Sequence, residues 1–143
     1  MRSYEITRGI IKLNSSLRDI FFYAIDGDDV GPLIRNKIIS NDIRGAAELS
    51  QNINKYFTAL SSILESRGHD IVFCGGDSLL SISTQLLDFQ PVDLPQGPCT
   101  ISIGIGTTAE YAYLALQLAK ARGKKQIVHI QNPKADTIYK WSY

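Results

Sequence analysis

Two short acidic stretches carry the residues best suited to chemistry. The first, Asp26-Gly27-Asp28-Asp29-Val30-Gly31, gathers three carboxylates and two glycines. The second, Gly75-Gly76-Asp77, places one carboxylate directly after two glycines. Like charges repel, so a fold that keeps several carboxylates together typically holds a cation among them. Carboxylates at neighbouring strand ends suit Mg²⁺, which takes a few carboxylates and completes its coordination with substrate phosphates.

The glycines add backbone groups that can bind phosphate or a metal ion. Gly75 and Gly76 allow the backbone to approach a phosphate closely and to donate N–H groups to it. The carbonyl of Gly27 offers one more oxygen to a metal ion. A pair of such ions stabilises the attacking and leaving oxygens of an in-line phosphoryl transfer. The alternative is that Gly-Gly-Asp is only a hairpin turn and that the other acids form a solvated loop.

A basic cluster follows near the C-terminus, in Lys120-Ala121-Arg122-Gly123-Lys124-Lys125. Lys120 and Lys124 are four residues apart, a spacing that predicts one shared helix face from which both cations neutralise a triphosphate. Cations near a helix C-terminus also complement the helix dipole. A purely structural role is therefore an equal alternative for this cluster.

The elements that position these residues follow from the hydrophobic pattern. The apolar run at 20–25 predicts a buried strand that ends in the first acidic stretch. Apolar runs on both sides of the Gly-Gly-Asp sequence predict a hairpin. Helices are expected at about 32–39, 46–67 and 107–122, and further strands at 100–106 and 126–130. This order indicates an α/β (α+β) fold, a ferredoxin-like palm with a sheet of about five strands and helices packed on it.

Length and composition are those of one soluble domain. The chain has 143 residues, of which 44% are apolar and 20% charged, and its net charge is +1. It therefore lacks an overall field that would recruit nucleic acid or a membrane, and no apolar run approaches the length of a membrane span. We expect an N-terminal extension at 1–19, the palm at 20–130 and a C-terminal tail at 131–143. Two cysteines without metal-ligand spacing favour a reducing, cytoplasmic setting.

Four segments resemble the nucleotide-cyclising palm superfamily, which contains the GGDEF diguanylate cyclases and the polymerase palm of type III CRISPR large subunits. They are residues 24–31, 72–77, 102–106 and 115–125. The small size and the Asp-Gly-Asp-Asp-Val-Gly string look most similar to the minimal CRISPR polymerases, which are stand-alone palms. The resemblance covers about residues 20–130.

The resemblance implies roles for individual residues. Asp26 and Asp77 match the catalytic acids. The metal-binding positions of the family fall on Asp26, Gly27, Asp77 and, with a less defined role, Asp28. The positions that bind phosphate and nucleotide fall on a larger set: Gly27, Asp28, Asp29, Val30, Gly31, Gly75, Gly76, Lys120 and Lys124.

Two positions depart from the family pattern. Ser78 stands where relatives carry an acid, which leaves the support for a second metal ion open. Ile34 stands where the GGDEF enzymes carry the Asn that reads guanine. ATP is therefore the expected substrate rather than GTP.

The resemblance thus implies a Mg²⁺- or Mn²⁺-dependent nucleotidyltransferase that makes a cyclic di- or oligonucleotide second messenger from ATP in antiviral defence. Joining two nucleotides implies a homodimer or higher homo-oligomer, and a second messenger implies an effector that reads it. No membrane and no stable nucleic-acid partner is expected. The alternatives are a palm resembling GTP cyclohydrolase or diguanylate cyclase, and a catalytically degenerate palm that binds nucleotide as a sensor or scaffold.

Overall fold

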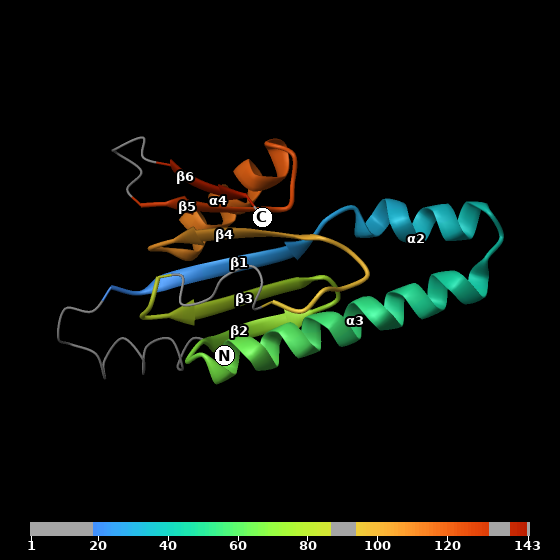
Figure 1. The fold of residues 1–143 in the computed structure, drawn as a ribbon, viewed down its shortest axis with the longest axis horizontal. Coiled ribbons are helices and arrows are strands. Elements are labelled where there is room, and N and C mark those ends of the chain that lie inside the picture. The colour runs from blue at the N-terminus through green and yellow to red at the C-terminus, as the bar shows by residue number, and fades with distance from the viewer. Residues whose placement is uncertain (1–18, 87–93, 132–137, 143) are drawn as a thin grey trace.

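The computed structural model describes residues 19–86, 94–131 and 138–142. Its strands are β1 (Phe21–Gly27), β2 (Asp70–Gly75), β3 (Ser78–Ser83), β4 (Ile101–Gly106), β5 (Gln126–Ile130) and β6 (Ile138–Ser142). Its helices are α2 (Val30–Ile39), α3 (Ile43–Ser66) and α4 (Ala109–Ala121). The strands form one six-stranded sheet in the order β2-β3-β1-β4-β5-β6 (Figure 1). Only β4 and β5 are parallel; the other neighbours are antiparallel.

This architecture confirms the expected mixed α/β fold, with the β2–β3 hairpin beside β1. The sheet has one strand more than expected, because β6, in the expected C-terminal tail, pairs with β5. The expected N-terminal extension lies almost entirely outside the described residues, as do residues 87–93. Within the described ranges, no helix combines the length and apolar character needed to cross a membrane.

The main hydrophobic core lies between α3 and one face of the sheet. Alternate residues of a strand point to the same face, and apolar residues three and four apart on α3 meet them. The α3 side contributes Ile53, Tyr56, Phe57, Leu60 and Leu64, and the sheet contributes Tyr23, Ile25, Leu79, Ile103, Ile105 and Ile127. Helix α3 begins earlier than predicted, because Asp42 caps it and accepts a 2.9 Å hydrogen bond from the Gly45 N–H.

Helix α4 packs over β1, β4 and β5 on the opposite face, and two glycines of β4 set its distance from the sheet. A Cβ atom at Gly104 would lie 2.1 Å from the Ala112 carbonyl oxygen and 2.2 Å from the Leu116 nitrogen. One at Gly106 would lie 2.6 Å from the Ala112 nitrogen. Close-packed interiors do not tolerate such overlaps. Glycine therefore allows the backbone of α4 to lie directly on β4.

Helix α2 differs from the other two because none of its residues is buried. It packs mainly against α3 and projects beyond the end of the sheet (Figure 1). The expected apolar face exists, but Ile38 and Ile39 are 53% and 75% exposed. Only Ile34 and Val30 reach the edge of the main core. The helix therefore serves mainly to continue the chain from the acidic stretch to α3.

Gly104→Ala should lower the free energy of unfolding by about 3 kcal/mol, because the added methyl group forces α4 away from β4. Gly31→Ala is the matched control, since no atom lies within 4 Å of the Cβ position at Gly31. It should change stability by less than about 1 kcal/mol, in the direction that the helix preference of alanine favours. Denaturant unfolding of both variants measures this, and equal stabilities would contradict the close contact.

Candidate active site

The end of β1 and the turn of the β2–β3 hairpin lie side by side, as expected. Asp26 of β1 stands opposite Ser78 of β3, and the Gly27 N–H donates a 2.8 Å hydrogen bond to the Asp77 carbonyl. A Cβ atom at Gly27 would lie only 3.2 Å from the Cβ of Asp77, so glycine lets the turn approach the strand. We call this region, residues 26–29 and 77, the acidic end of the sheet.

A lysine ammonium lies at the centre of the acidic end. Lys120 Nζ is 2.7 Å from Asp26 Oδ2 and 3.5 Å from Asp28 Oδ1, and it donates a 2.8 Å hydrogen bond to the Gly27 carbonyl. Burial by itself lowers the pKa of Lys120, but the hydrogen bond to Asp26 and the charges of Asp26 and Asp28 outweigh it. The net effect raises the pKa of Lys120 above its ordinary value. Three oxygens thus converge on one positive charge.

Ser78 orients the Asp26 carboxylate. Its hydroxyl donates a 2.6 Å hydrogen bond to Asp26 Oδ1, while Oδ2 faces Lys120. In the sequence alone, Ser78 stands out only because relatives carry an acid at this position. Its positioning role follows from the pairing of β1 with β3, which sets Ser78 opposite Asp26.

Asp28 is buried, with 3% of its surface exposed, and protein donors occupy both of its oxygens. The Ser102 hydroxyl donates to Oδ1 at 2.7 Å. The Thr100 hydroxyl and the Lys125 backbone N–H donate to Oδ2 at 2.8 Å and 3.0 Å. Asp28 therefore joins the end of β1 to β4 and to the turn after α4. Its role as a metal or nucleotide ligand stays a prediction; this geometry suits a residue that positions its neighbours.

Three non-glycine residues around the acidic end adopt positive φ: Asp29 at 57°, Lys124 at 63° and Lys125 at 49°. Side chains make this conformation unfavourable, and such strain is concentrated at functional sites. Asp29 and Lys124 also form an ion pair with each other. One ion pair therefore joins two residues with strained backbone, one after β1 and the other after α4.

The predicted helical spacing of Lys120 and Lys124 is wrong. Helix α4 ends at Ala121, and Gly123 follows with a φ of 110°, so Lys124 lies in the turn beyond the helix. Both lysine side chains nevertheless reach the acidic end, Lys120 from the helix and Lys124 from the turn.

The remaining predicted residues surround the same end of the sheet. Asp77 is half-buried, and among the residues that the structure describes its carboxylate has no hydrogen bond or ion pair. Gly75 and Gly76 are exposed, with no atom within 4 Å of either Cβ position. Gly31 is similarly open at the start of α2, whereas Val30 packs against the core. The turn and the helix start thus leave room for a ligand.

Asp28→Asn should lower the free energy of unfolding by about 2–4 kcal/mol, because an amide NH₂ then faces buried donors and Lys120 loses a charged partner. Asp77→Asn is the control, since its carboxylate has no protein partner within the described ranges; it should change stability by less than about 0.5 kcal/mol. Thermal unfolding of the two variants measures the difference. An Asp28→Asn protein as stable as the Asp77→Asn protein would refute the positioning role of Asp28.

Solved structures of a Csm1–Csm4 cassette share this fold. The one in complex with one ATP matches with a TM-score of 0.55 at 14% identity. The one in complex with pppApA matches with a TM-score of 0.53 at 13% identity. Each match covers 76% of this chain but only 20% of the other chain, so the chain spans about one fifth of the length of these relatives. Among curated proteins, none matches the sequence.

The family comparison agrees with the motifs. Residues 22–130, well over half of the chain, match the model of the minimal CRISPR polymerase domain. The matched range contains both acidic stretches and the basic cluster. It confirms the family that the motifs indicated: this chain belongs to the minimal CRISPR polymerase domain family.

Proposed function

We propose that this domain is a nucleotidyltransferase that converts ATP into a cyclic di- or oligonucleotide. One observation carries the proposal: the Asp26 carboxylate and the Gly27 carbonyl converge on a positive charge, and Asp77, whose carboxylate has no partner among the described residues, adjoins Gly27. The family of the chain supports a polymerase-type reaction. The ATP and pppApA in the Csm1–Csm4 structures support adenine nucleotides as ligands of this fold.

The acidic end fits a divalent cation such as Mg²⁺ or Mn²⁺. Asp26, Gly27 and Asp77 supply hard oxygen ligands, and two of them already direct oxygens at the Lys120 ammonium. Within the described residues, no group of three or more acidic, histidine or cysteine side chains could form an all-protein cage. Mg²⁺ usually binds through one or two carboxylates plus substrate phosphates. When bound, such ions would neutralise phosphate charge and activate the attacking hydroxyl.

The phosphates would bind to the cations and backbone groups around the acidic end. Lys120 and Lys124 already bind carboxylates, Asp26 and Asp29, so binding a triphosphate exchanges one anionic partner for another. Helix α2 begins at Val30, directly after the acids. The N–H groups and dipole at a helix N-terminus favour an anion. Gly75 and Gly76 leave the hairpin turn open to the same ligand.

The proposed reaction joins two nucleotides. A ribose hydroxyl of one nucleotide attacks the α-phosphorus of the other, and a new P–O bond forms. The bond from the α-phosphorus to the bridging oxygen breaks, and pyrophosphate leaves with that oxygen. The hydroxyl proton passes to water or to the Asp77 carboxylate, while the Ser78 hydroxyl keeps Asp26 oriented. A second such step closes the ring.

Ring closure between two nucleotides requires a second nucleotide position, so we propose a homodimer or higher homo-oligomer in which two acidic ends face each other. The product would act as a second messenger in antiviral defence and would be read by a separate effector. ATP and Mg²⁺ are both supplied in the cytoplasm, which is the compartment we propose for the reaction.

A second candidate function is nucleotide binding without turnover. Ser78 favours it, because a hydroxyl replaces a carboxylate that could bind a second metal ion. In that case the protein would act as a sensor or scaffold that responds to ATP.

Incubation of the protein with each nucleoside triphosphate and Mg²⁺ or Mn²⁺ should yield pyrophosphate and a cyclic adenylate from ATP alone. Liquid chromatography with mass spectrometry identifies the products.

Asp26→Ala and Asp77→Ala should each lower the rate by about 1000-fold or more, equivalent to several kcal/mol of transition-state stabilisation. Pyrophosphate release that survives in both variants would rule out this mechanism. Tight ATP binding without product would favour the second candidate.

Lys124→Gly should raise the free energy of unfolding of the domain and raise the KM for ATP. Glycine removes a left-handed side-chain conformation that costs about 1–2 kcal/mol, and the lost ion pair with Asp29 is exposed and contributes little. The KM for ATP should rise about ten-fold, because one phosphate-binding charge is gone.

Lys124→Ala provides the matched control, since it removes the same charge but keeps a Cβ at positive φ. It should show the same KM as Lys124→Gly at a lower melting temperature. Equal melting temperatures for the two variants, or a KM unchanged from that of the wild type, would contradict this role.

A further inference from the structure

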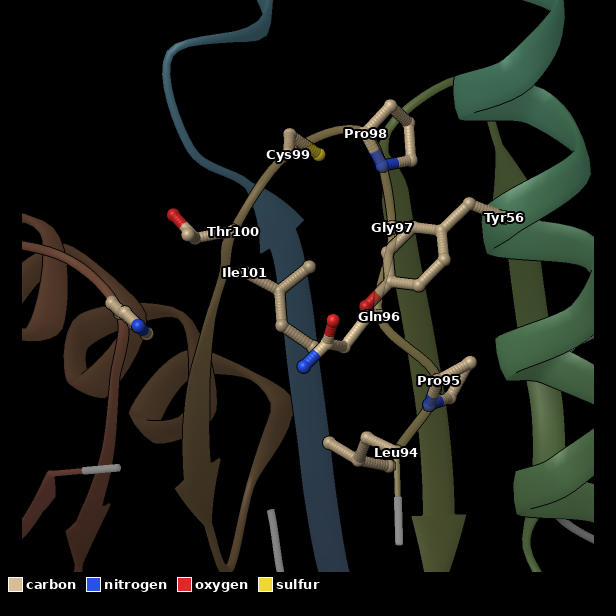
Figure 2. A pocket seen from close by; sticks show the side chains of 10 residues that line it. Tyr56, Leu94, Pro95, Gln96, Gly97, Pro98, Cys99, Thr100 and Ile101 are labelled. Atoms are coloured by element: carbon tan, nitrogen blue, oxygen red, sulfur yellow. The ribbon is translucent and has the colours of Figure 1, made fainter. Parts of the chain in front are cut away.

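A cavity of about 640 Å³ opens on the α3 side of the sheet, next to the acidic end. Its walls are Tyr56 of α3, the loop from Leu94 to Thr100, Ile101 at the start of β4, and Lys125. Figure 2 shows the Tyr56 ring reaching from α3 toward Gly97, and it shows the side chains of Gln96 and Ile101 at the same cavity. The volume lies within the range of small-molecule sites.

The lining suits a flat ligand with apolar faces. Leu94, Pro95, Pro98 and Ile101 provide apolar surface, and Tyr56 provides an aromatic ring. Aromatic rings and prolines are rigid, so they present this surface with little loss of conformational entropy. A planar heterocycle would therefore meet apolar surface here.

Two polar side chains line the cavity, those of Tyr56 and Gln96. Tyr56 is 8% exposed and Gln96 is exposed, and among the described residues neither the Tyr56 hydroxyl nor the Gln96 amide makes a hydrogen bond. Burial, followed by the charge of Cys99, raises the pKa of Tyr56 to about 12, so its hydroxyl remains neutral and is able both to donate and to accept a hydrogen bond. Both groups are therefore available to hydrogen-bond the polar edge of a ligand.

The cavity adjoins the acidic end through residues that both share. Thr100 and Lys125 line the cavity, and both donate hydrogen bonds to Asp28 Oδ2, at 2.8 Å and 3.0 Å. Cys99 also lines it, and its Sγ lies 3.3 Å from the Cβ position at Gly27. A ligand in the cavity therefore lies next to the groups that we propose bind the metal ion and the phosphates.

We propose that this cavity holds the adenine base of the nucleotide whose phosphates bind at the acidic end, and that Gln96 and Tyr56 read the base. This inference rests on the proposed function. A carboxamide offers a donor and an acceptor side by side, which matches the N6 amine and N7 of adenine. Guanine presents two acceptors, O6 and N7, at the corresponding edge. Selection of ATP thus comes from a group in this cavity.

The two cysteines provide a test that does not depend on turnover. Cys99 lines the cavity, whereas Cys74 is exposed on β2 and serves as the internal control. Without divalent metal, saturating adenosine should slow alkylation of Cys99 by N-ethylmaleimide about five-fold or more, as mass action predicts for a covered site. The rate at Cys74 should not change. Guanosine and tripolyphosphate should protect neither cysteine.

A second measurement tests the reading of the base. Calorimetric titration should show that the wild-type protein binds ATP about ten-fold or more tightly than GTP, and that Gln96→Ala loses this preference. Gln96 is exposed, so its replacement should leave the melting temperature unchanged. Tyr56→Phe keeps the ring and removes only the hydroxyl, and it should reduce the preference partially.

The outcomes separate this inference from the proposed function. Equal protection of Cys99 by adenosine and guanosine, or an unchanged preference for ATP in Gln96→Ala, would overturn the base site even if ATP is cyclised. Selective protection by adenosine without any pyrophosphate release from ATP would uphold the base site and overturn the proposed enzymatic function.

Discussion

The acidic end of the sheet depends on one buried carboxylate, that of Asp28. A buried charge is costly unless it is paired and hydrogen-bonded. Here the hydroxyls of Thr100 and Ser102 and the backbone N–H of Lys125 satisfy it, and Lys120 lies 3.5 Å away. These donors come from β4, from the loop before it and from the turn after α4. The hydrogen bonds to this one carboxylate therefore fix the positions of these three segments.

The contact between α4 and β4 provides the second constraint. Gly104 and Gly106 allow the helix backbone to lie directly on the strand. That distance brings Lys120 within 2.7 Å of Asp26 Oδ2 and within hydrogen-bonding distance of the Gly27 carbonyl. A larger residue at either glycine would move the cation away from the acids. Packing in the core thus determines the electrostatics of the site.

The two faces of the sheet carry different parts of the proposed nucleotide site. Asp26 contacts Lys120 on the α4 side, where charge and metal chemistry would take place. The cavity bordered by Tyr56 and Ile101 opens on the α3 side, where shape and hydrogen bonds would select the base. Thr100 and Lys125 belong to both parts, because they line the cavity and also donate hydrogen bonds to Asp28.

The sequence by itself determined five of the six strands, the three helices and the meeting of the Gly-Gly-Asp turn with the end of β1, because hydrophobic periodicity and glycine-rich turns are local signals. The tertiary structure alone decided that Asp28 is buried, that Ser78 orients Asp26 and that Lys120 lies among the acids. It also decided that Tyr56 and Gln96 share a cavity. The physical reason is distance along the chain: the donors to Asp28 Oδ2 lie 72 and 97 residues away from it. Only strand register and helix packing bring such partners together, and no local pattern encodes them.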